Sequence, residues 1–77
     1  MPYFLYSIFD DETPVELLEK QDDLDGARKA RTRYDRSRGP HDNFFVDFFF
    51  AETAEEAGEK ARTRHEEWLA TLGKEKS

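Results

Sequence analysis

Nine of the 11 aromatic residues in this 77-residue chain fall in two short segments, which constrain the fold more than any other feature. These segments are residues 3–9 (YFLYSIF) and 44–51 (FFVDFFFA). Aromatic and β-branched residues are enriched in strands, and each run has the length of a single strand. The sequence therefore predicts two aromatic β-strands, one near the N-terminus and one in the second half of the chain.

A further strand and a helix are expected between them. Turn-forming residues occupy 10–14, and residues 15–20 (VELLEK) fit either a short strand pairing back on the first or a helical turn. Asp22 is the expected N-cap of a helix, and Gly39-Pro40 the expected stop. The apolar stripe of this helix has three- and four-residue spacing and comprises Leu24, Ala27, Ala30 and Tyr34.

A second helix is expected from the capping box of Thr53 and Glu56 to a C-cap at Gly73. Its expected buried stripe comprises Ala54, Ala57, Ala61, His65, Trp68 and Leu72. Residues 1–73 then form one domain, and residues 74–77 a frayed tail.

The element order is therefore ββαβα, which predicts an α+β fold. We expect a two-layer sandwich with a small three-stranded sheet in the order 2-1-3 and both helices on one face. The strand at 15–20 and the last strand would be joined by a right-handed crossover if they are parallel. The alternative omits the strand at 15–20 and leaves a βαβα unit.

The pentapeptide KARTR occurs at 29–33 and again at 60–64, and the similarity extends along both predicted helices at an offset of 31 residues. A duplicated βα unit and ordinary helix physics both explain the repeat. Most of its charges have an acid four residues away, as in Asp25 with Lys29, and such pairs stabilise a helix without any ligand. Two neighbouring helices would instead bring the basic flanks together.

The chain is acidic, with a formal net charge of −6, but its bases gather in two islands that contain the repeats. The first island has few acids to match it, and it predicts a basic patch comprising Arg28, Arg31, Arg36 and Arg38. Such a patch suits an acidic protein or a phosphate. Overall acidity argues against a dedicated nucleic-acid binder.

The two aromatic strands have more apolar residues than one covered face requires. If the helices cover a single face, the other face retains an apolar surface that marks an interface. The predicted interface residues are Tyr3, Leu5, Phe9, Phe45, Asp47 and Phe49. We expect this face to dock on a second copy, with another protein, a local cover or stacked RNA bases as alternatives; Asp47 and the net acidity argue against RNA.

No catalytic or cofactor-binding pattern is present. The absence of cysteine excludes disulfides and thiolate metal sites, and no serine has an activating pattern. His41 is expected in a loop and His65 at the edge of the core, and the acidic run at 22–26 lacks the ligands of a calcium loop. Without a signal peptide or an apolar run of membrane-spanning length, the chain is expected to be cytoplasmic.

These features predict a small non-enzymatic protein-interaction module without cofactors. Its expected partner is a second copy, through the aromatic sheet face or the edge of the last strand, or another protein. The alternative function is an acidic inhibitor or regulator that occupies a basic site on a nucleic-acid-handling protein.

Overall fold

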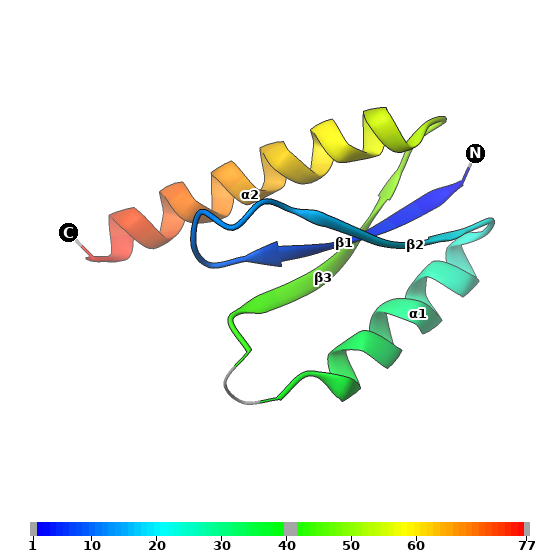
Figure 1. Ribbon diagram of the computed structural model, residues 1–77, viewed down its shortest axis with the longest axis horizontal. Coiled ribbons are helices and arrows are strands. Elements are labelled where there is room, and N and C mark those ends of the chain that lie inside the picture. Colours follow the sequence, from blue (N-terminus) through cyan, green and yellow to red (C-terminus); the bar gives the residue numbers. More distant parts are fainter. Residues whose placement is uncertain (1, 40–41, 77) are drawn as a thin grey trace.

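The computed structural model describes residues 2–39 and 42–76. Its elements are β1 (Tyr3–Phe9), β2 (Glu16–Gln21), α1 (Leu24–Ser37), β3 (Phe44–Phe50) and α2 (Ala54–Lys76), shown in Figure 1. The sheet order is β2-β1-β3, and β1 is antiparallel to both neighbours. The predicted α+β class, the ββαβα order and the 2-1-3 sheet are therefore confirmed.

The central strand β1 is buried on both of its faces. Leu5 and Ile8 have no exposed surface, and they point to opposite sides of the sheet because side chains alternate along a strand. Leu5 packs with Ala30 of α1, whereas its neighbour Tyr6 packs with Ala57 of α2. Two separate apolar clusters therefore lie on the two faces, one beneath each helix.

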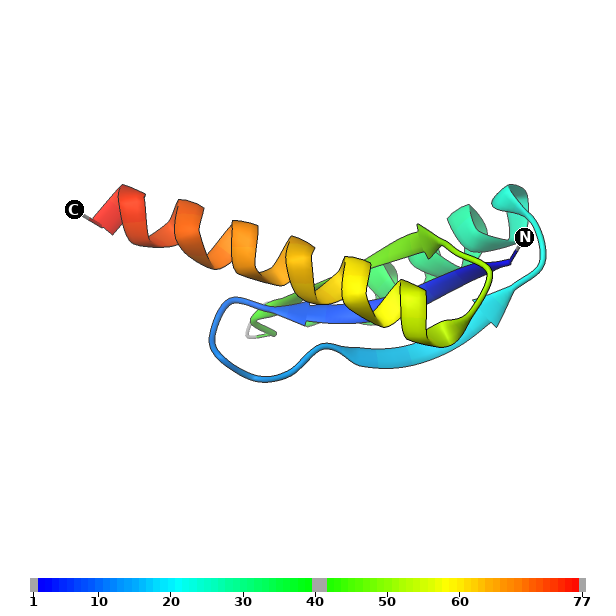
Figure 2. The ribbon, with the colours of Figure 1, turned by 90° about the horizontal axis from the view of Figure 1, so that it is seen from above.

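The two helices consequently lie on opposite faces of the sheet. Figures 1 and 2 show α2 on one side of the three strands and α1 on the other, so the molecule has three layers. The prediction that both helices share one face is wrong. The physical reason is that β1 is apolar at consecutive positions, so each of its faces needs its own helical cover.

Both helices begin with a side-chain cap. The N-cap of α1 is Asp23, which accepts a hydrogen bond of 2.6 Å from the Gly26 N–H, so the predicted cap at Asp22 is one residue too early. At the start of α2, Thr53 Oγ1 accepts from the Glu56 N–H across 3.2 Å, as predicted. The Glu56 carboxylate accepts from the N–H of Glu52 instead of closing the box on Thr53.

The C-terminal ends of the two helices differ in how closely they match the predicted ends. α1 ends at Ser37, close to the stop predicted at Gly39-Pro40. Pro40 lies outside the described residues. α2 continues through Gly73 to Lys76, so the predicted C-cap at Gly73 is wrong. A glycine inside a helix costs only about 1 kcal/mol relative to alanine, and strong helix formers follow it.

A tyrosine ties α2 to the sheet at the start of the helix. The Tyr6 hydroxyl donates to the Ala54 carbonyl across 3.1 Å. Burial raises the pKa of Tyr6, and the positive charge of Arg62 opposes this shift. The hydroxyl also lies against Gly58, where a Cβ would come within 3.3 Å of it. Gly58 therefore lets α2 approach β1 closely.

Candidate interaction surface

The outer edge of β3 faces no other strand within the described chain, because β1 pairs only with its inner edge. The Asp10 N–H donates to the Asn43 carbonyl, and the Ala51 N–H donates to the Pro2 carbonyl. These bonds and the continuous register fix which β3 residues bond to β1, because the pattern alternates along an antiparallel pair. The backbone groups that point outward belong to Phe44, Val46, Phe48 and Phe50. We call these groups the open edge.

Basic side chains cover the two ends of the open edge. Arg38 donates a guanidinium hydrogen bond to the carbonyl of Phe44. At the other end, the Lys60 ammonium donates to the carbonyl of Phe50. Charged side chains at a sheet edge hinder the addition of another strand. The two ends are therefore capped by side chains, not by another backbone.

An acidic side chain covers the middle of the open edge. The Asp47 carboxylate accepts a hydrogen bond of 2.9 Å from the Phe48 N–H. Arg31 of α1 lies 3.6 Å from this carboxylate, and its guanidinium carbon lies 4.9 Å from the centre of the Phe48 ring. The Arg31 and Asp47 side chains are 41% and 30% exposed, so this ion pair is accessible to solvent and contributes little stability.

An aromatic cluster lies beside the open edge on the α1 side of the sheet. The Tyr3 ring centre lies 4.9 Å from that of Phe50 and 5.7 Å from that of Phe48. Phe50 is 45% exposed, and both other rings are partly exposed. Partly exposed aromatic rings are enriched at protein interfaces. The α1 side of the open edge therefore has an apolar surface.

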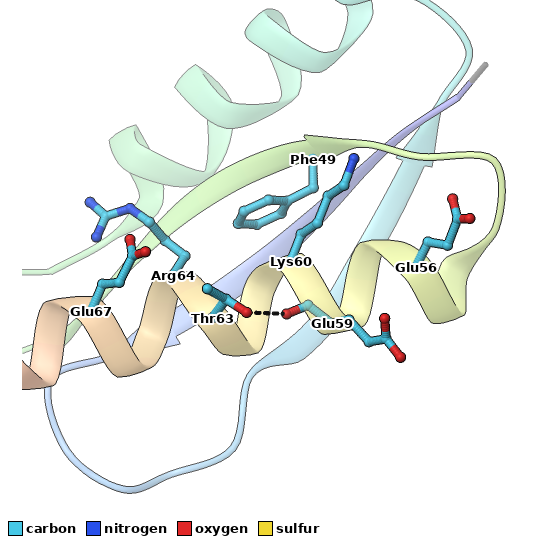
Figure 3. A pocket seen from close by; sticks show the side chains of 7 residues that line it. All are labelled: Phe49, Glu56, Glu59, Lys60, Thr63, Arg64 and Glu67. Atoms are coloured by element: carbon cyan, nitrogen blue, oxygen red, sulfur yellow. Dashed lines mark hydrogen bonds between the residues drawn. The ribbon is translucent and has the colours of Figure 1, made fainter.

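A groove lies beside the open edge on the α2 side of the sheet. It has a volume of about 690 Å³, and Figure 3 shows the Phe49 ring between the strand and the helix. The other lining residues come from one face of α2 and are Glu56, Glu59, Lys60, Thr63, Arg64 and Glu67. Aromatic contacts continue from this groove toward the C-terminal part of α2, where the Phe45 and Trp68 ring centres are 4.7 Å apart.

The predicted interface residues do not share one face. The register pairs Tyr3 with Phe50 and Leu5 with Phe48, so both lie on the α1 side, as does Phe9. The other three predicted residues, Phe45, Asp47 and Phe49, lie on the α2 side. The prediction of a single open aromatic face is therefore wrong, since α1 and α2 each cover one side. What the structure leaves open among the described residues is the two sheet edges, of which β3 is the aromatic one.

The predicted basic patch also divides into two parts. Arg28 and Arg36 line a depression on the exposed side of α1 together with Lys29, Thr32 and Arg33. Arg31 and Arg38 instead point to the open edge, where they contact Asp47 and Phe44. Two of the four predicted arginines therefore lie at the open edge of β3.

The two KARTR segments do not form a joint surface, because α1 and α2 lie on opposite faces of the sheet. Ala30 and Ala61 are buried at equivalent positions, as predicted from the repeat. The expected pair of Lys29 with Asp25 forms at 3.0 Å and raises the pKa of Lys29 through a hydrogen bond and the carboxylate charge. The charged side chains of the second KARTR segment, residues 60–64, point to β3 and to solvent.

His65 lies at the edge of the core and is used to hold a loop. His65 is 8% exposed, and its Nε2 lies 2.7 Å from the Asp11 carbonyl oxygen. It thus fastens the loop after β1 to α2, in agreement with its predicted place at the edge of the core. Hydrogen bonds from Thr13, and one from Asn43, lower the pKa of Asp11. His41 lies outside the described residues.

A polar network joins β2 to α1 on the side away from the open edge. The Glu19 carboxylate accepts hydrogen bonds from Gln21, Arg33 and Tyr34. These contacts, that from Gln21 most of all, lower the pKa of Glu19 although burial opposes the shift. Burial and the hydrogen bond to Glu19 raise the pKa of Tyr34. This network links β2 to α1 and has a structural role.

Sequence reasoning missed Lys60, Arg64 and Trp68 as neighbours of β3. Their signal was the spacing of α2, since residues 60 and 64 flank the buried stripe at Ala57 and Ala61. Three or more potential metal ligands do not come together anywhere in the described part of the chain. The described helices also include none that is long and apolar enough to cross a membrane.

Comparisons with known proteins do not assign the chain to a family. A scan against protein-family models finds no match, and searches of curated proteins and of solved structures find no similar protein.

Proposed function

We propose that this chain is a protein-interaction module that forms a homodimer by pairing the open edges of two β3 strands. The observation that supports it is a strand edge whose outward backbone groups bond to no other strand, with aromatic side chains on both sides of the same strand. Backbone groups supply hydrogen bonds in β-strand addition, and the side chains beside them supply specificity. Each sheet face packs against one of the chain's own helices, which favours the β3 edge over a sheet face as the docking surface.

The β3 sequence itself favours pairing with a second copy. The segment FFVDFFF reads almost identically in both directions about Asp47. Two such strands related by a two-fold axis would run antiparallel, which is the arrangement of an isologous dimer. Aromatic and aliphatic residues would then face one another on both sides of a six-stranded sheet, and such cross-strand pairs stabilise a sheet. The two Asp47 side chains would lie opposite one another at the axis, and this like-charge pair opposes association.

The other edge of the sheet is less suitable. β2 has the sequence ELLEKQ, and its exposed residues include Glu16 and Lys20. Its register with β1 shifts between Leu5 and Tyr6, which marks a bulge or irregularity. Charged residues and irregular edges oppose strand addition. The β3 edge is therefore the better candidate for self-association.

A small core gives association a physical benefit. Leu5 and Ile8 are the largest side chains that are completely buried, and four of the five phenylalanines of β3 are half-buried. Small domains without disulfides or metals often gain stability through oligomerisation. The caps from Arg38, Asp47 and Lys60 must leave before the edges pair. Surface contacts of this kind contribute about 0–1 kcal/mol each, so backbone hydrogen bonds can replace them.

Size-exclusion chromatography with light scattering over a dilution series tests this proposal. The expected mass at high micromolar concentration is twice the monomer mass of 9.1 kDa. A monomer mass at every concentration would overturn it. Val46→Pro removes an outward N–H without removing a bond to β1, and proline is tolerated at strand edges, so this variant should be monomeric. Val46→Ala keeps the N–H and controls for the smaller side chain.

Phe50→Lys is a second variant that avoids the core. Phe50 is 45% exposed, so lysine at this position places a charge beside the open edge without disturbing buried residues. It should weaken dimerisation and leave the circular dichroism spectrum unchanged. Unchanged self-association in both Phe50→Lys and folded Val46→Pro would show that another surface forms the dimer.

A further inference from the structure

The groove beside β3 carries an ordered pattern of charge. Its α2 residues recur at three- and four-residue spacing and form one stripe along the helix. Glu56 and Glu59 lie at the N-terminal end of the stripe, Lys60 and Arg64 in the middle, and Glu67 at the C-terminal end. Figure 3 shows the Lys60 and Arg64 side chains extending from α2 toward β3, whereas Glu59 points away from Phe49. The stripe therefore has bases flanked by acids.

Pairing of two β3 strands would bring two copies of this stripe together. The two-fold axis would be normal to the extended sheet, so both α2 helices would lie on the same face and run antiparallel. α2 packs over β1 and β3, which places its axis roughly one to one and a half strand spacings from the seam. The two helix axes would then be roughly 10–14 Å apart, a gap that glutamate, lysine and arginine side chains span.

We infer that the groove receives the α2 helix of a second copy, with the basic middle of each stripe against the acidic ends of the other. This inference rests on the proposed pairing of β3 and identifies the second contact of the same dimer. A two-fold axis sets each stripe against a reversed copy of itself, and a small shift along the helix then places acids opposite bases. One such alignment sets Glu59 against Arg64, and another sets Lys60 against Glu67. Charge complementarity of this kind selects partners and fixes their register.

Helix pairing would also change the surroundings of Phe49. Its ring is half-buried in the groove, where it packs against the cluster that includes Ala57 and Ala61 of α2. A second helix over the groove would cover this ring and the stems of the basic side chains. The same contact thus adds apolar burial to complementary charge, as in the fully buried part of typical interfaces.

Two charge-altered chains test the inference without assuming a register. Lys60→Glu/Arg64→Glu makes the stripe wholly acidic, and Glu59→Lys/Glu67→Lys makes its middle and C-terminal end basic. Each chain alone should dimerise at least about tenfold more weakly than the native chain, because like charges then meet across the two-fold axis. An equimolar mixture should form a heterodimer with close to native affinity, and native mass spectrometry distinguishes it from both homodimers.

Glu55→Lys/Glu66→Lys is the matched control for Glu59→Lys/Glu67→Lys, because it makes the same change in net charge outside the groove. It should dimerise like the native chain. All variants should retain the native circular dichroism spectrum, and the mixture itself shows that both altered chains remain competent. Lys60 also caps the Phe50 carbonyl, but the mixture contains the same altered chain, so recovery cannot come from the cap.

The outcomes separate this inference from the proposed function. If the native chain dimerises, Val46→Pro does not, and both charge-altered chains dimerise like the native one, the groove inference is overturned and β3 pairing stands. Weakened homodimers without recovery in the mixture would also overturn it. If the native chain is monomeric at every concentration, the proposed function fails and takes this inference with it.

Discussion

The carboxylate of Asp47 accepts a 2.9 Å hydrogen bond from the N–H of Phe48, the very backbone group that points out of the sheet at the middle of β3. An acidic residue thus occupies a donor that an incoming strand would need. Arg31 of α1 forms an ion pair with the same carboxylate. The strand that we propose as the dimer interface therefore carries its own removable cap, and this cap can be tested.

Replacing Asp47 with alanine should strengthen self-association. The change frees the Phe48 N–H and removes a negative charge from the seam between the two copies. We expect the association constant to rise about tenfold, equivalent to 1.4 kcal/mol, as judged by sedimentation equilibrium. Asp22→Ala removes the same charge from an exposed site beyond β3 and should have no effect. Equal or weaker association of Asp47→Ala would argue against edge pairing.

Ser7 offers a test of the core that does not depend on dimerisation. It is 3% exposed, and its Oγ has no hydrogen-bond partner among the described residues. Burying an unpaired hydroxyl costs free energy, so Ser7→Ala should raise the free energy of unfolding by about 1 kcal/mol. Urea denaturation of a monomeric variant measures this change. A loss of stability would mean that the hydroxyl has a partner in solution.

The contact of Tyr6 with Gly58 predicts a non-additive pair of substitutions. A Cβ at position 58 would lie 3.3 Å from the Tyr6 hydroxyl, which is held by the Ala54 carbonyl. Gly58→Ala should therefore gain less than the roughly 1 kcal/mol expected from helix propensity. In a Tyr6→Phe background the same change should gain the full amount.

Thermal or urea unfolding of the four chains of this double-mutant cycle measures the coupling. We expect an interaction energy of about 0.5 kcal/mol or more, because the two residues are in direct contact. Additive effects would show that the hydroxyl can move away freely and does not limit the approach of α2 to β1.

The Glu19 network predicts a loss of stability in acid. Hydrogen bonds from Gln21 and Tyr34 and the charge of Arg33 hold the pKa of Glu19 below its ordinary value of 4.5. A carboxylate with a lowered folded-state pKa contributes stability that is complete above pH 4.5 and is lost as the pH falls through its folded-state pKa. Stability should thus decline below pH 4.5.

Glu19→Gln isolates this contribution. It should lower stability at pH 7 and flatten the decline below pH 4.5, in urea titrations at a series of pH values. Glu55→Gln changes an exposed acid at the start of α2, for which we expect the native pH profile. A native acid profile in Glu19→Gln would assign the acid dependence to other carboxylates, such as Asp11, whose pKa is also lowered.

The strands and their order followed from the sequence because their signals are local and strong. Residues 3–9 and 44–51 are too aromatic for a surface helix or a loop, and turn residues separate the strand at 15–20 from the first. The N-termini of both helices were predicted from residues that favour N-caps. The cap at Thr53 was predicted correctly, whereas the α1 cap is Asp23 and not Asp22.

The placement of the helices could not be predicted in the same way. Consecutive apolar residues such as Leu5 and Tyr6 show that both faces of β1 are covered, but the cover can be a helix of the same chain or another molecule. The edge caps depend on the reach of long side chains across space. Lys60 is ten residues from Phe50, and its contact has no periodic signal in the sequence.

Hydrogen exchange at the Val46 amide tests the pairing of β3 most directly. In the monomer this N–H points outward, whereas the amides of Phe45 and Asp47 on either side bond to β1. With NMR detection at increasing protein concentration, edge pairing predicts that Val46 protection rises with the dimer fraction while its neighbours stay protected throughout. Rapid exchange of Val46 at every concentration, alongside protected neighbours, would contradict pairing of the open edges.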